Sequence, residues 1–176
     1  MKFTDEQRLI VMMLADIQKA LNVNGDFDPS FVSKMAAWKD EFAIAFRYDM
    51  IFDGGDLPDS FRFVINVVDM WSFIERAFER LDPAGRAELK ERVGIWGENP
   101  KFSGFDGNNE AELMSHTRLL IEDLGRFEEF KGRDFNSHVP LEDRYAAMYV
   151  VFEPIRAGLW ERPMNVDELS AVLAAR

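Results

Sequence analysis

The chain has 176 residues, of which 47% are hydrophobic and 30% charged, a composition typical of a folded domain and not of a disordered segment. Its formal net charge of −11 opposes binding to a phosphate backbone or an anionic membrane, so neither nucleic acid nor membrane is an expected partner of this acidic protein. It has no cysteine, no signal-peptide-like start and no apolar run of about 18 residues, so a cytoplasmic protein is expected.

Helical periodicity begins near the N-terminus. Thr4 and Gln7 form a capping-box pattern, and apolar residues then recur every fourth position, which predicts a helix over residues 4–21. Asp28 supplies an N-cap acceptor and Pro29 suits the first helical position, so a second helix is predicted to start there.

The strongest periodic signal predicts a central helix over about residues 58–81, after an aromatic stretch at residues 42–52 that is expected to be helical too. The apolar positions of the central helix step by three and four residues: Val64, Val67, Trp71, Ile74, Phe78 and Leu81. This stripe fits either a dimer seam or a helix buried within one chain. Bulky rings suit a two-stranded coiled coil poorly, so burial within the monomer is favoured. Self-association would then use leftover aromatic side chains: Phe42, Phe46, Tyr48 and Phe52.

Further helices are predicted in the second half. Asp82 and Pro83 start a short helix that ends at Gly94, and a glycine-rich loop held by aromatic rings follows as far as residue 108. The next helix is predicted to run from Asn109 to about residue 130.

At the C-terminal end, Pro140 is predicted to enter a helix that Pro154 kinks or ends, and Asn165 is predicted to cap a last short helix. No segment has the two-residue period of a strand. The predicted fold class is therefore all-α, as one compact multi-helix domain spanning residues 1–176 around the central helix.

Four segments spread along the chain carry a family resemblance. They are TDEQRLI from Thr4, FSGFDGNNE from Phe102, IEDLGRF from Ile121 and FNSHVP from Phe135, the last with Tyr145 and Met148 at the expected spacing. These segments resemble the YfbU family of bacterial proteins, whereas residues 26–81 match it only loosely. The resemblance implies an α-helical fold and self-association. It implies no reaction, because the family is functionally uncharacterised and brings no catalytic residues.

The loop at residues 106–110 places oxygen-bearing side chains at alternate positions, a pattern that a hard cation can use. EF-hand spacing from Asp106 fails, because the sixth position is Ala111 and the twelfth is Thr117. No metal is therefore predicted. The structural alternative is that the asparagines of this loop cap the following helix.

A ligand site is the second hypothesis for the same loop. His138, in a later polar loop, is the better of the two histidines as a ligand-binding residue, although capping at a helix entry explains that loop equally well. Arg118 and Arg126, on the helix between the two loops, are expected either to bind an anionic ligand or to form salt bridges with acidic side chains such as Glu122. The full set of candidate ligand-binding residues is Asp106, Asn108, Asn109, Glu110, Arg118, Arg126, Asn136, His138 and Tyr145.

No nucleophile elbow, catalytic triad or phosphate-binding glycine loop is present in the sequence, so neither a cofactor nor a reaction is predicted. The chain is predicted to be a self-associating or protein-interaction module. The alternative is a small-ligand-binding protein or hydrolytic enzyme that uses the loop at residues 106–110 with His138. A weaker alternative is a transcription-linked regulatory domain. The loop at residues 102–110 is accordingly either a binding site or a structural plug.

Overall fold

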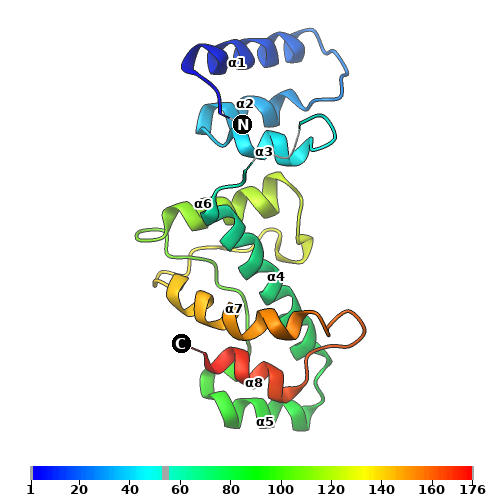
Figure 1. The fold of residues 1–176 in the computed structure, drawn as a ribbon, viewed down its shortest axis with the longest axis vertical. Helices are drawn as coiled ribbons and strands as arrows, with labels where there is room; N and C mark the ends of the chain where they lie inside the picture. The colour runs from blue at the N-terminus through cyan, green and yellow to red at the C-terminus, as the bar shows by residue number, and fades with distance from the viewer. Residues whose placement is uncertain (1, 53–55, 176) are drawn as a thin grey trace. The chain divides into compact units, whose positions relative to one another are not determined.

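The computed structural model describes residues 2–52 and 56–175, which fold into α-helices joined by loops and short turns (Figure 1). These residues contain no strand, only one isolated parallel bridge between Phe105 and Asn136. The all-α prediction is confirmed. No helix in the described part of the chain is long and apolar enough to cross a bilayer. The chain divides into two compact units, Met1–Pro58 and Asp59–Arg176, so its behaviour as one domain stays a prediction.

The described residues of the first unit form three helices: α1 (Asp5–Ala20), α2 (Pro29–Trp38) and α3 (Glu41–Arg47). The start of α1 is the predicted capping box, with Thr4 and Gln7 each accepting the other's backbone N–H. The carboxylate of Asp28 accepts the N–H groups of the first turn of α2, as predicted.

The end of α3 differs from the prediction, because the helix stops at Arg47 and not at residue 52. The next residue, Tyr48, is anchored across the unit. Its hydroxyl accepts a hydrogen bond from the Asp28 N–H at 2.9 Å, and its ring lies edge-on to Phe27 with centroids 5.0 Å apart. These contacts fix Tyr48 at the point where α3 ends.

The second unit is built on α4 (Asp59–Arg80), which matches the predicted central helix. The stripe positions Val64, Val67 and Ile74 have no exposed surface, and Trp71 is 4% exposed. Burial within the monomer is thereby confirmed. The helices that pack against α4 are α6 (Ala111–Arg118), α7 (Glu142–Arg156) and α8 (Val166–Ala174), while α5 (Pro83–Val93) packs against α8 (Figure 1).

Local capping fixes the ends of α5 and α8. Asp82 accepts the Gly85 N–H at 2.7 Å, and Gly94 follows α5 with a φ of +65° before a short 3₁₀ turn, as predicted for a helix stop. Asn165 and Glu168 form a second capping box at α8. Within α7, Pro154 lies two residues before the end of the helix at Arg156.

The single helix predicted from Asn109 to about residue 130 begins at Ala111 and is wrong beyond residue 123. After α6 the chain continues as one π-helical turn, Leu119–Asp123, here called the π-turn, and the Leu124 N–H donates to the Leu119 carbonyl at 2.9 Å. The backbone then reverses, because Gly125 and Phe127 have φ values of +63° and +53°. A 3₁₀ turn, Glu128–Phe130, completes the segment.

Candidate functional site

The loop at residues 102–110 closes the core of the second unit with aromatic rings. Phe102 is 3% exposed and Phe105 is fully buried. The Phe102 ring centroid lies 5.7 Å from that of Phe130, 6.3 Å from that of Phe135 and 5.9 Å from that of Tyr145. The loop is therefore a plug that completes the core beside α4 and α7.

The same loop is joined to the loop at residues 134–141, about 30 positions along the chain. The Phe105 N–H donates to the Phe135 carbonyl at 3.0 Å, and the Ser137 N–H donates to the Phe105 carbonyl at 3.1 Å. Gly104, at a φ of +80°, lets the two backbones approach, because a Cβ there would lie 2.0 Å from the Phe135 oxygen. We call the two paired segments the loop joint.

Glu110 ties the loop joint to α7. Glu110 is only 7% exposed. One of its carboxylate oxygens accepts the N–H groups of Leu141 and Glu142, each at 2.7 Å. The other oxygen accepts the Asp106 N–H at 2.9 Å. A carboxylate suits this position because the first turn of a helix presents unpaired N–H groups and a partial positive charge.

Asp106 organises the turn before α6. Its carboxylate accepts hydrogen bonds from the Asn109 side chain and from the Asn108 N–H, and these bonds lower the pKa of Asp106, with a smaller contribution from the charge of His138. The Asn136 side-chain oxygen accepts the N–H groups of Gly107 and His138 at 3.0 and 3.1 Å. The structure thus brings the predicted polar residues of both loops together.

The carboxylates of this cluster already serve as backbone and amide acceptors. The exposed members are Asn108, Asn109 and His138, and His138 has a left-handed φ of +58°. Within the described residues no group of three or more His, Asp or Glu side chains is arranged to hold a metal ion. Ligand binding at the loop joint stays a prediction.

The remaining candidates are Tyr145, whose ring lies 5.5 Å from that of Phe105 in the loop joint, and two arginines. Tyr145 is 2% exposed within the ring cluster, and burial raises the pKa of its hydroxyl far above the ordinary value. Arg118 ends α6 and Arg126 follows the π-turn, both with exposed side chains. No hydrogen bond within the described part of the chain joins Arg118 to the loop joint.

A feature that sequence reasoning missed is the outward face of α1. Six large apolar side chains on this helix are each more than half exposed: Leu9, Ile10, Met13, Leu14, Ile17 and Leu21, the last at the C-cap. At about 100° per residue they fall within an arc of roughly 140°. We call this surface the α1 stripe. Its periodicity is visible in the sequence, but the side of the helix that meets the protein is not.

The inward side of α1 is set by a small residue and an ion pair. Ala15 is 4% exposed and lies roughly 160° around the helix from the centre of the α1 stripe. Arg8 is on the same side as Ala15 and pairs with Glu41 of α3 at 2.5 Å, with side chains only 14% and 5% exposed. A buried charge that lost its partner would be strongly unfavourable, so this pair keeps the α1 stripe outward.

An apolar groove of about 400 Å³ borders the α1 stripe. Val11 and Leu14 of α1 form one wall, Val32 and Ile44 belong to α2 and α3, and Leu14 is part of both groove and stripe. The aromatic side chains predicted to form an association surface are less exposed than the α1 stripe. Phe42 is only 9% exposed, and Phe46, Tyr48 and Phe52 are partly covered. The exposed apolar surface of this unit is mainly aliphatic.

The fold and these features define an all-α protein of two helical units, one closed by a buried loop joint and the other carrying an uncovered apolar helix face. The YfbU domain family model matches residues 1–175, and the chain belongs to the YfbU family. A similar protein is the UPF0304 protein MJECS11 of Methanocaldococcus jannaschii, 30% identical over 109 residues. The matched region covers 58% of this chain and 60% of that relative.

The close approach at Gly104 gives a stability prediction. Gly104→Ala should lower the free energy of unfolding by more than about 4 kcal/mol, because the new Cβ would collide with the Phe135 backbone. Gly132→Ala is the matched control, since Gly132 has a φ of +76° but open space around its Cα, and it should cost about 1–2 kcal/mol. Urea denaturation followed by circular dichroism measures both. Equal losses would contradict a tight loop joint.

Asp106 gives a pH prediction. Its pKa in the fold is lowered from 3.8, so the stability it contributes is complete above about pH 4 and is lost as the pH falls through the folded-state value. Asp106→Asn should therefore flatten the acid side of the curve of unfolding free energy against pH, below about pH 4. Asp143→Asn removes an exposed carboxylate of the same unit as the control. An unchanged slope in Asp106→Asn would contradict the hydrogen-bonded carboxylate.

Proposed function

We propose that this protein is a self-associating module without chemistry of its own, in which two copies pack through the α1 stripe as an antiparallel helix pair. The observation that carries the proposal is the orientation of α1. Its large aliphatic side chains are more than half exposed, while the small Ala15 is its one buried residue. Monomeric proteins rarely leave so continuous an apolar face in contact with water, and such faces mark interaction sites.

The charges beside the α1 stripe favour a second copy as the occupant. Asp5 and Glu6 lie in the first turn of α1 and Lys19 lies in the last, so the helix is acidic at its start and basic at its end. In an antiparallel pair the acidic first turn of each helix comes near the basic last turn of the other, and the two helix dipoles are opposed. A parallel pair would place like charges together.

A membrane surface fits the same stripe less well. Interfacial helices carry lysine and arginine beside their apolar face, because these side chains are attracted to anionic lipids. Asp5 and Asp16 lie beside the α1 stripe, and Glu6 lies within its arc at the N-terminal end of the helix. The charge balance therefore favours a protein partner over an anionic bilayer.

The expected affinity follows from the apolar area. Six side chains that are each half exposed contribute roughly 1 kcal/mol apiece when covered, or on the order of 10 kcal/mol over two copies. Association costs at least about 4 kcal/mol in translational, rotational and side-chain freedom, which leaves about 6 kcal/mol, and the groove at Leu14 adds further apolar surface. A dissociation constant of about 1–100 μM is expected.

A cytoplasmic location is part of the proposal. The chain contains no cysteine, which suits a reducing compartment where disulfides are not used for stability. Its net charge of −11 also suits a module whose contacts are with protein and not with nucleic acid.

The proposal predicts that Met13→Glu abolishes dimerisation. Met13 is at the middle of the α1 stripe and is 55% exposed, so the substitution should leave the fold intact while placing two carboxylates in the apolar contact. Analytical ultracentrifugation from 1 to 200 μM should show the dissociation constant rising by at least about 100-fold. Val150→Glu, at a 72% exposed valine of α7, adds the same charge elsewhere and should change it little.

The orientation of the pair is tested by disulfide cross-linking. Because the chain has no cysteine, Ile10→Cys and Ile17→Cys chains that are mixed and oxidised should cross-link to each other, whereas Ile17→Cys alone should cross-link poorly, since an antiparallel pair places Ile10 of one helix near Ile17 of the other. A wild-type chain that stays monomeric at 200 μM would contradict the proposal. If the wild-type chain instead bound anionic vesicles and Met13→Glu abolished that binding, the α1 stripe would be a membrane-binding surface.

A further inference from the structure

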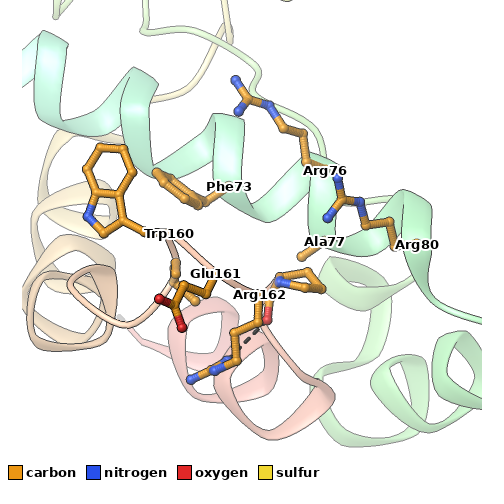
Figure 2. Close-up of a pocket in the computed structure, with 9 residues that line it drawn as sticks. Phe73, Arg76, Ala77, Arg80, Trp160, Glu161 and Arg162 are labelled. Atoms are coloured by element: carbon orange, nitrogen blue, oxygen red, sulfur yellow. Dashed lines mark hydrogen bonds between the residues drawn. The ribbon is translucent and has the colours of Figure 1, made fainter.

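A second surface, in the Asp59–Arg176 unit, has a chemistry unlike that of the α1 stripe. Figure 2 shows a pocket between the C-terminal half of α4 and the loop that joins α7 to α8. Its volume is about 220 Å³. Phe73, Ala77 and Arg80 of α4 form one wall, and Trp160 and Arg162 lie on the opposite side. The small side chain of Ala77 leaves room between the rings and the arginine.

Three arginines line this pocket although the chain is strongly acidic. Two are already paired: Arg76 bonds Glu129, and Arg162 makes a bidentate pair with Glu168 at 2.6 Å for both bonds. Arg80 has no ion pair or hydrogen bond within the described residues, and its side chain is exposed. A guanidinium without a protein partner in a concave site is a ready receptor for an anion, since its planar fork matches a carboxylate.

The aromatic side of the pocket is also uncovered. Trp160 is 77% exposed, so it contributes little to the core, and Figure 2 shows its indole beside the Phe73 ring. Phe73 is held in place by Phe152, with ring centroids 5.6 Å apart. Two neighbouring rings, one of them fixed, form a surface on which a flat apolar group can stack.

We propose that this pocket binds a small aromatic carboxylate, with the carboxylate on Arg80 and the ring against Phe73 and Trp160. The volume admits one six-membered ring with its acid group, being smaller than a typical drug-sized site of about 300 Å³ or more. Glu161 also lines the pocket, and its negative charge opposes a doubly charged phosphate ester more than a singly charged carboxylate. This site is independent of self-association through α1.

Titration of the full-length chain with benzoate tests the proposal, with the indole N–H signals in the NMR spectrum as readout. Benzoate should bind with a dissociation constant of about 1 mM or tighter and shift the Trp160 signal, which is assigned as the one missing from Trp160→Phe. Acetate lacks the ring and benzyl alcohol lacks the charge, so each should bind at least about tenfold more weakly. Phenyl phosphate should bind more weakly than benzoate.

Matched variants identify the anion receptor. Arg80→Gln should weaken benzoate binding at least about tenfold, because it removes the charge-assisted hydrogen bonds. Lys101→Gln removes one exposed positive charge of the same unit and should change binding less than about twofold. Trp160→Ala, at an exposed position that folding does not need, should weaken binding several-fold.

Three results would overturn the assignment. A benzoate dissociation constant above about 10 mM would show that the pocket is no carboxylate site. Equal losses in Arg80→Gln and Lys101→Gln would show that only net charge matters. Tighter binding of phenyl phosphate than of benzoate would reassign the site to phosphate esters.

Discussion

The Asp59–Arg176 unit depends on one buried carboxylate. Glu110 accepts three backbone N–H groups, one from its own loop and two from the start of α7, and so holds together segments about 30 residues apart. A buried carboxylate is tolerated only where donors replace the lost water. With Glu110 in place, Phe102 and Phe105 close the aromatic core against Tyr145. The loop at residues 102–110 therefore has a structural role in closing the core, and few of its residues are exposed.

A comparable constraint governs the Met1–Pro58 unit. The pair between Arg8 and Glu41 turns the polar and small side of α1 inward and leaves the aliphatic side uncovered. A monomer would gain more free energy of folding by burying the six apolar side chains than by burying this ion pair, because apolar burial is the main stabilising term in folding. It is consistent with a helix whose apolar face is covered by association, and this is the basis of the proposed function.

Local signals in the sequence predicted much of the fold. The capping boxes at Thr4 and Asn165 and the stripe of α4 depend on neighbouring residues alone, so they were readable without tertiary structure. The π-turn after Arg118 was missed because the helical period continues through it, while the backbone reversal depends on a non-glycine residue, Phe127, at positive φ. The convergence of the two polar loops could be proposed from residue types. The exposure of α1 and the pocket at Arg80 could not, because each depends on which side of a helix the rest of the chain covers.

The loop joint stabilises the fold, and we propose that association takes place at a different surface, on α1. The most direct test is Glu110→Gln, measured by urea denaturation and by ultracentrifugation, with the exposed Glu91→Gln as its control. The amide nitrogen would face a backbone N–H, so the free energy of unfolding should fall by about 1–3 kcal/mol, with the dimer dissociation constant unchanged wherever the chain is folded. Unchanged stability together with weakened dimerisation would show that Glu110 acts in association and not in folding.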